Sequence, residues 1–190
     1  MPTVPAPLLR RAHDGYAGAH RGHRSPVVLG FDPGLHRTGY GALCPNGPAP
    51  RVVEAGVLTT RASEPLGPRL YRLYADVDEL VREMRPRLIV LEDLFAHPRF
   101  PRTAIVLGHV RGIICLAAAS ARIEVMALAP SAVKRAVTGS GQASKAQVQA
   151  AVRVLLAMRG VLDAHAADAL ALAYTGMARA TSGRARLGRS

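Results

Sequence analysis

Apolar and polar positions along the chain predict alternating strands and helices between residues 26 and 178. The apolar run at residues 27–31 has the length of a buried strand and ends at Asp32, where Pro33 and Gly34 interrupt it. Residues 38–43 and 51–58 are expected to form two more strands after short turns. Three neighbouring strands joined in this way form an antiparallel meander.

From residue 66 the apolar spacing changes to three and four residues, which is typical of an amphipathic helix, and Pro86 ends it. Residues 87–92 then form an apolar run that closes on Glu92, as expected for a strand parallel to the first with the helix as crossover. Helices are predicted over 103–121, from Pro130, from Ser144, and over 164–177, with a fifth strand at 123–128. Ser144 and Gln147 have the spacing of a capping box.

The helix predicted over residues 103–121 combines an apolar stripe with two glycines. Val110 and Ile114 belong to the stripe, while Gly108 and Gly112 permit the close approach of another element. We expect this helix to pack on the sheet and also on a second copy of itself.

The composition favours an anionic partner. The chain has 190 residues, 49% of them hydrophobic, enough for one core, and its 25 basic and 13 acidic residues give a net charge of +12. Four Arg lie in residues 1–25 and four in 176–190, where no periodic apolar pattern is present. We therefore predict disordered basic segments at 1–25 and 179–190 around one domain at 26–178. Two cysteines, and no charge-free apolar stretch of 18 residues, favour a reduced intracellular protein without a membrane span.

Four polar residues are candidates for chemistry. Asp32 and Glu92 each close a buried strand, and open sheets bind ligands at the carboxyl ends of parallel strands. His165 and Asp168 lie three residues apart, and so on one face of the last helix, in nearly apolar surroundings. The alternatives are that Asp32 only begins an Asp-Pro-Gly turn and that His165 is a cap or a solvated first-turn residue.

Convergence of these carboxylates would require a divalent cation, because grouped like charges are costly to ionise. Oxygen ligands suit Mg²⁺ or Mn²⁺ rather than a structural zinc. Two such ions can activate water and stabilise the leaving oxygen of a phosphodiester. An acidic metal site in a basic protein therefore predicts a nuclease.

Two further groups of residues suggest contacts with nucleic acid. Phe95 and Phe100 alternate with Arg99 and Arg102, a pattern suited to base stacking beside phosphate contacts, although both rings could instead pack into the core. The chain has only two lysines, Lys134 and Lys145. A compact ammonium suits a single phosphate oxygen, and chance is the alternative.

The order of motifs resembles the RuvC family, bacterial Holliday junction resolvases of the ribonuclease H-like superfamily. The segments that carry the resemblance are, in order, VLGFDPGLHRTGYGAL, VLEDLF, LGHVRG, PSAVKRAVTGSGQASKAQV and HAADALALA. The resemblance implies an α/β, ribonuclease H-like fold with a five-stranded mixed sheet, three antiparallel strands followed by two parallel ones, flanked by helices.

The resemblance also implies roles for residues. Asp32, Glu92, His165 and Asp168 fall on the family's metal-binding and catalytic tetrad. Many members have Asp at the position of His165, so this side chain is either a metal ligand or a group that orients water or phosphate.

Other family positions concern the DNA. Phe95 matches the aromatic residue inserted near the junction crossover, and Phe100 could share that task because the following loop is about a residue longer. Lys134 and Lys145 match lysines near the scissile phosphate, and we count Lys145 with the catalytic set. Arg99 and Arg102 are expected to bind DNA.

The implied enzyme is a crossover junction endodeoxyribonuclease, a hydrolase that resolves four-way (Holliday) junctions by paired symmetric nicks in recombination and repair. The expected cofactor is Mg²⁺, two ions per active site, with Mn²⁺ able to substitute. The expected partners are four-way junction DNA, a second copy in a homodimer, and a branch-migration motor of the RuvA and RuvB type, with no membrane. The expected location is the bacterial cytoplasm, in association with the nucleoid.

Three other functions are compatible with parts of the pattern. A related nuclease would keep the carboxylates and cut simple duplexes or hybrids equally well. A binding module without catalysis would bind junctions without metal-dependent cleavage, and the intact acidic set argues against it. An ATPase of the actin or sugar-kinase type also begins with an Asp and a glycine-bearing hairpin, but it needs a second lobe, for which this chain is too short.

Overall fold

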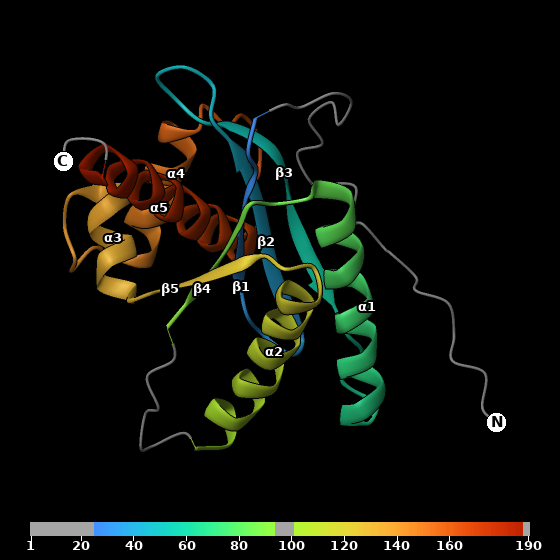
Figure 1. The fold of residues 1–190 in the computed structure, drawn as a ribbon. Coiled ribbons are helices and arrows are strands. Elements are labelled where there is room, and N and C mark those ends of the chain that lie inside the picture. Colours follow the sequence, from blue (N-terminus) through green and yellow to red (C-terminus); the bar gives the residue numbers. More distant parts are fainter. Residues whose placement is uncertain (1–24, 94–100, 188–190) are drawn as a thin grey trace.

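The computed structural model describes residues 25–93 and 101–187, and of these the side chains at 101–102 and 182–187 are not described. The elements, in order, are β1 (Val28–Asp32), β2 (Arg37–Cys44), β3 (Arg51–Thr59), α1 (Leu66–Met84), β4 (Leu88–Glu92), α2 (Pro101–Ser120), β5 (Glu124–Leu128), α3 (Pro130–Thr138), α4 (Lys145–Leu155) and α5 (Ala164–Leu187). They form a central sheet with helices on both faces (Figure 1).

The sheet is mixed, with strand order β3-β2-β1-β4-β5. β1 pairs antiparallel with β2, and β2 with β3, while β4 pairs parallel with both β1 and β5. The predicted fold class is therefore confirmed, including the role of α1 as a crossover between two parallel strands.

Each face of the sheet has its own hydrophobic core. Leu29 and Phe31 of β1 pack with residues of α1 and α2, such as Leu73 and Ile114. The opposite face packs against α3, α4 and α5, and Val28 and Val90 belong to this second core. Residues 28, 30 and 32 of β1 therefore face α5, because successive side chains of a strand point to opposite faces.

The same alternation applies to β4. Leu88 and Val90 belong to the core beneath α5, so Glu92 at the end of the strand points to that side too. Since β1 and β4 are parallel and adjacent, Asp32 and Glu92 lie at the same end and on the same face of the sheet.

Glycines allow α5 to lie unusually close to β1 and β2. A Cβ atom at Gly30 would lie 2.1 Å from the carbonyl oxygen of Ala169, and one at Gly39 would lie 2.1 Å from that of His165. A side chain at either position would therefore collide with the helix backbone. This close contact places the first two turns of α5 directly over the end of β1.

α5 is longer than the sequence pattern indicated. It was predicted to end at residue 177, before a disordered tail, but it continues to Leu187. The predicted end of the helix was wrong because it relied on apolar periodicity, whereas Ala178, Arg179 and Ala180 are exposed and have high helix propensity. The predicted N-terminal extension lies outside the described residues, except for Ser25.

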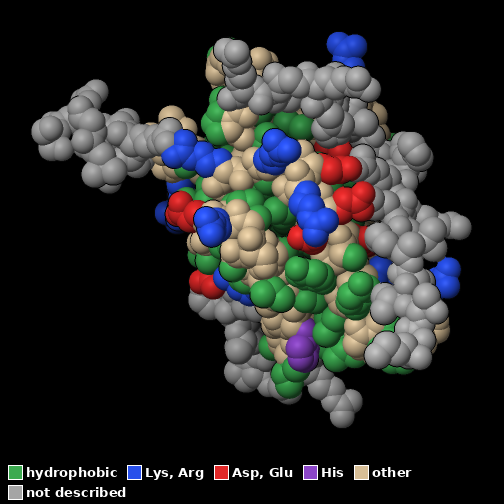
Figure 2. Space-filling model, turned by 45° about the vertical axis from the view of Figure 1, so that its right-hand side comes forward, with side chains coloured by type: hydrophobic (Ala, Val, Ile, Leu, Met, Phe, Trp, Pro, Cys, Tyr) green, Lys and Arg blue, Asp and Glu red, His purple; other side chains and the backbone are tan. Residues whose placement is uncertain are grey.

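α2 has two unlike faces. Val110, Ile114, Ala117 and Ala118 are buried, whereas Ile105 and Leu116 are 61% and 57% exposed. A window at residues 103–120 is long and apolar enough to cross a membrane by length and composition alone. Figure 2 views the molecule with the α1 side turned forward. Hydrophobic side chains gather on the lower part of this face, below a mixed group of basic and acidic side chains.

Candidate active site

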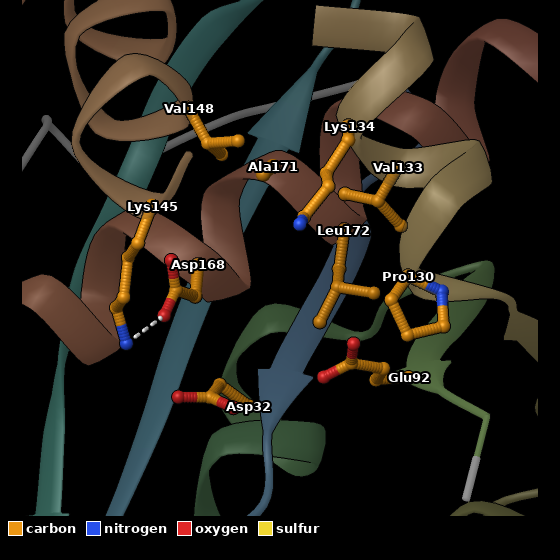
Figure 3. A pocket seen from close by; sticks show the side chains of 10 residues that line it. All are labelled: Asp32, Glu92, Pro130, Val133, Lys134, Lys145, Val148, Asp168, Ala171 and Leu172. Atoms are coloured by element: carbon orange, nitrogen blue, oxygen red, sulfur yellow. Dashed lines mark ion pairs between the residues drawn. The ribbon is translucent and has the colours of Figure 1, made fainter. Parts of the chain in front are cut away.

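Three carboxylates and two lysines line one cavity of about 400 Å³. Asp32 and Glu92 come from the ends of β1 and β4, and Asp168 comes from the second turn of α5. Lys134 of α3 and Lys145 of α4 extend into the same space (Figure 3). The apolar part of the lining is formed by Pro130, Val133, Val148, Ala171 and Leu172.

Asp32 is hydrogen-bonded to His165, the fourth residue of the predicted tetrad. The Nδ1 atom of His165 lies 2.8 Å from Oδ2 of Asp32, and the side chains are 36% and 20% exposed. The first turn of α5 is held by Asp163, whose Oδ1 accepts a hydrogen bond from the backbone N–H of His165 at 2.9 Å. The guanidinium of Arg37, at the start of β2, lies 2.5 Å from Oδ2 of Asp163.

Lys145 pairs with the carboxylate on α5. Its Nζ lies 2.8 Å from Oδ2 of Asp168, and the dashed line in Figure 3 marks this ion pair. Lys145 is the first residue of α4, directly after the capping box of Ser144 and Gln147, in which both reciprocal hydrogen bonds are present. The predicted capping box is thus confirmed, and it determines where Lys145 leaves the backbone.

The electrostatics of the cavity favour a bound cation. Burial raises the pKa of Asp32, and the charge of Asp168 adds to this, while the hydrogen bond from His165 and the charge of Lys145 oppose it. Burial also raises the pKa of Glu92, helped by the charges of Asp32 and Asp168 and opposed by both lysines. The hydrogen bond to Asp168 raises the pKa of Lys145 despite partial burial.

The donor set fits a hard divalent cation in its chemistry. Asp32, Glu92 and Asp168 offer oxygen atoms at one end of the sheet. The charge of Asp168 raises the cost of ionising Asp32, and the charges of both raise that of Glu92, a cost that a cation removes. No group of three or more His, Cys, Asp and Glu side chains within residues 25–93 and 101–187 is already arranged to hold a metal ion. The carboxylates therefore converge on one cavity without forming a preformed cage.

The structure brings together Asp32, Glu92, His165, Asp168 and Lys145, all predicted as catalytic, together with Lys134. The other DNA-binding predictions cannot be placed in this way. Phe95, Arg99 and Phe100 lie outside the described residues, and Arg102 lies in α2 with its side chain outside the description.

Three supporting residues were missed or undervalued from sequence. Asp163 and Arg37 were not among the candidates from sequence. Arg111 of α2 donates a hydrogen bond to the backbone carbonyl of Glu92 at 2.5 Å. Its only sequence signal was its place in the LGHVRG segment.

A mixed sheet of this order, with carboxylates at the ends of β1 and β4 and on the last helix, defines a nuclease of the ribonuclease H-like class. Among protein families, the model of "Crossover junction endodeoxyribonuclease RuvC" matches residues 28–176. The chain belongs to the RuvC family of crossover junction endodeoxyribonucleases. Metal dependence is general to this family.

Individual relatives are similar over most of their length. RuvC of Rhodopirellula baltica is 43% identical over 150 residues, which cover 78% of this chain and 84% of that one. RuvC of Rubrobacter xylanophilus is 42% identical over 148 residues, covering 77% and 82%. The solved structure of Thermus thermophilus RuvC in complex with a Holliday junction substrate is similar with a TM-score of 0.78 at 33% identity, covering 83% of this chain and 96% of that one.

Proposed function

We propose that Asp32, Glu92 and Asp168 bind the metal with which this enzyme hydrolyses a phosphodiester bond of four-way junction DNA. The observation that carries the proposal is that these three carboxylates and two lysines line a single cavity. The metal is Mg²⁺, two ions per site, with Mn²⁺ able to substitute, because the donors are oxygen atoms.

When bound, the ions supply an activated water and stabilise the leaving oxygen. Asp32 lies at the end of the strand next to β4 and beneath α5, so it would supply its carboxylate to both ions. His165 orients Asp32 through Nδ1, and we assign its other ring nitrogen to contact with metal, water or phosphate.

The lysines act on the DNA. Lys134 and Lys145 reach the cavity from two different helices, so together they can hold one phosphate group beside the carboxylates. Lys145 pairs with Asp168 at 2.8 Å and therefore stands where a phosphate oxygen would meet the metal site. We assign Lys145 to the reaction and Lys134 to substrate binding.

Four-way junction DNA is the proposed substrate of this chain. The structure of Thermus thermophilus RuvC with such a junction has the same fold at 33% identity, and the net charge of +12 here suits a polyanion. The aromatic residues Phe95 and Phe100 remain the predicted wedge at the crossover, with Arg99 and Arg102 as predicted phosphate contacts.

We further propose a homodimer formed by the outer face of α2. Ile105, Gly108, Gly112 and Leu116 are exposed and follow one another at three- and four-residue spacing, so they form one stripe. Cβ atoms added at Gly108 and Gly112 would meet nothing within 4 Å, so a second helix can approach closely there. A self-complementary contact of this kind gives two-fold symmetry, which matches two like strands of a junction.

The remaining expectations follow from membership in a family whose named relatives are bacterial proteins. We propose that the enzyme acts in the cytoplasm, at the nucleoid, in recombination and repair, and that a motor of the RuvA and RuvB type moves the junction for it. In the proposed homodimer the second copy would bury the apolar stripe of α2, so we propose no membrane partner for it.

The decisive experiment compares cleavage of a synthetic four-way junction with that of a matched linear duplex, in Mg²⁺ or Mn²⁺, for the wild-type chain and Asp32→Asn. We expect symmetric nicks in the junction alone, and a loss of cleavage in the variant with junction binding retained. Equal cutting of both substrates would make the enzyme a general nuclease. Cleavage by Asp32→Asn at the wild-type rate would remove Asp32 from the site.

A further inference from the structure

Arg111 connects α2 with the candidate active site from the opposite side of the sheet. α2 belongs to the core layer of Leu29 and Phe31, whereas Glu92 points to the layer of α5. The Nη1 atom of Arg111 nevertheless donates a hydrogen bond to the carbonyl oxygen of Glu92, at the end of β4, at 2.5 Å. This contact involves the backbone of Glu92 and leaves its carboxylate free to face the cavity.

The end of β4 lies beyond the strand pairing on one side, so its last carbonyl needs another hydrogen-bond donor. The pairing of β1 with β4 ends at Phe31 and Leu91, so Glu92 lies one residue beyond the last pair on that side. On the other side, the N–H of Asp93 donates to the carbonyl of Leu128 at 2.8 Å. The peptide group between Glu92 and Asp93 is therefore held at its N–H by β5 and at its carbonyl by Arg111.

Arg111 extends from a part of α2 that is anchored in the core. Its neighbour Val110 is fully buried, as is Ile114 one turn later, so this part of α2 is fixed against the core. A charged donor makes a stronger hydrogen bond to a carbonyl than a neutral one does. A planar group on such a helix can hold the peptide plane in one orientation, which in turn sets the direction of the Glu92 side chain.

We propose that Arg111 is a positioning residue, which holds the peptide of Glu92 and so aims its carboxylate into the metal site. The inference rests on the proposed role of Glu92 as a metal ligand. It has a further consequence, because the outer face of α2 is the proposed dimer contact. A shift of α2 at that contact would move Arg111 and with it the carboxylate of Glu92.

The test uses Arg111→Met, which keeps much of the aliphatic stem and removes every donor, and Arg111→Lys, which keeps the charge. Arg153→Met is the matched control, since Arg153 also donates to a backbone carbonyl, that of Gly160 at 2.7 Å, at an exposed position of α4. Glu92→Gln serves as the reference for loss of the ligand. For each chain, Mn²⁺ binding is measured by calorimetry, junction cleavage in single turnover, junction affinity without divalent metal, and thermal unfolding.

We expect Arg111→Met to weaken Mn²⁺ binding and slow cleavage, each by about 10- to 100-fold, as is usual when a group supporting a metal ligand is lost. Junction affinity without metal should stay within about twofold of wild type, because Arg111 is not proposed to bind DNA. Arg111→Lys should recover part of both losses, and Arg153→Met should match wild type. If Arg111→Met fails to fold, Arg111→Lys decides by the same two measurements.

The outcomes separate this inference from the assignment on which it rests. Wild-type Mn²⁺ affinity and cleavage in Glu92→Gln would overturn both. Loss of both in Glu92→Gln, with Arg111→Met equal to Arg153→Met, would overturn the role of Arg111 alone. If the loss of cleavage in Arg111→Met is fully explained by the fraction of the variant that is unfolded, Arg111 has only a structural role, and the inference is likewise overturned.

Discussion

At the residue scale, the candidate site depends on side chains that do not line its cavity. Asp163 accepts a hydrogen bond from the backbone N–H of His165, and its backbone carbonyl accepts the first helical bond of α5, from Ala167 at 2.9 Å. It is therefore a helix cap that also fixes the residue bonded to Asp32. The pair of Asp163 with Arg37 is about 40% exposed on each side, so its own contribution to stability is small.

Asp163→Ala should therefore lower stability and activity by more than the loss of the ion pair alone would. We expect it to lower the free energy of unfolding by about 1 kcal/mol through the lost cap, and to slow junction cleavage severalfold through a looser His165. Asp163→Asn keeps a capping oxygen and should stay close to wild type in both. Denaturant unfolding and single-turnover cleavage measure the two effects. Equal damage from both substitutions would show that the charge of Asp163, rather than its cap, matters.

Asp76 illustrates a buried acid outside the site. It lies on the inner face of α1, is 5% exposed, and its Oδ1 has no hydrogen-bond partner within the described residues. Burial raises its pKa from 3.8 to about 6, with help from Glu79 and against the charge of Arg72. The folded state thus binds this proton more tightly than the unfolded chain does, so stability falls as the pH rises from about 4 to about 6.

Asp76→Asn should remove this loss. At pH 7.5 we expect the free energy of unfolding to rise by about 1 to 3 kcal/mol, because no carboxylate has to ionise in the core. At pH 4, where Asp76 is largely protonated in the folded protein, the difference should nearly vanish. Denaturant unfolding at a series of pH values measures both. A destabilised variant at pH 7.5 would mean that the ionised carboxylate makes favourable contacts.

At the element scale, the close packing of α5 on β1 and β2 sets the distance between its two site residues and the strand ends. Gly30 and Gly39 lie directly beneath the backbone of α5, and Gly41 lies beneath Leu170. Because Gly30 and Gly39 meet backbone atoms, the helix cannot yield there by a change of side-chain rotamer. The position of Asp168 over Asp32 therefore follows from residues without side chains.

Gly30→Ala should force α5 away from the sheet. We expect a loss of about 3 kcal/mol or more in the free energy of unfolding, since its Cβ would lie 2.1 Å from the carbonyl oxygen of Ala169, together with a large loss of cleavage in the protein that still folds. Gly67→Ala, in α1, is the control, because its Cβ would meet nothing within 4 Å, and it should leave stability equal or slightly higher. A Gly30→Ala variant as stable and active as wild type would contradict this account of the packing.

At the scale of the whole molecule, the exposed stripe of α2 predicts the oligomeric state. Leu116→Glu should raise the dimer dissociation constant by at least about tenfold, because a two-fold contact would bring two like charges together. Val154→Glu is the matched control, since Val154 is a hydrophobic residue of α4 that is 80% exposed. Sedimentation velocity measures the dissociation constants, and thermal unfolding of both variants should remain near wild type.

A wild-type chain that stays monomeric at micromolar concentration would contradict the homodimer. Equal weakening by Val154→Glu and Leu116→Glu would instead place the contact elsewhere than α2. Junction cleavage by the monomeric variant should produce unpaired nicks, because one site would act on one strand at a time.

Most elements could be predicted from local patterns, and the misses have physical causes. The amphipathic pattern from residue 66 and the break at Pro86 correctly predicted the extent of α1. Ser144 correctly marked the start of α4. The end of α5 was missed because helix propensity, unlike core packing, leaves no periodic signal. Arg111 was missed because a side-chain bond to a distant backbone carbonyl leaves no spacing in the sequence at all.

The sequence alone predicted the order of strands and helices from apolar periodicity, while its ordered motifs resembled a family that implies the five-stranded mixed sheet; periodicity and motifs are local properties of the chain. It also identified Asp32 and Glu92, since each closes a buried strand. The way in which His165 and Asp168 meet them, and the link from α2 to Glu92 through Arg111, are evident from tertiary contacts alone. Those contacts join residues far apart in the chain, and they depend on how closely the helices pack on the sheet, which no local pattern records.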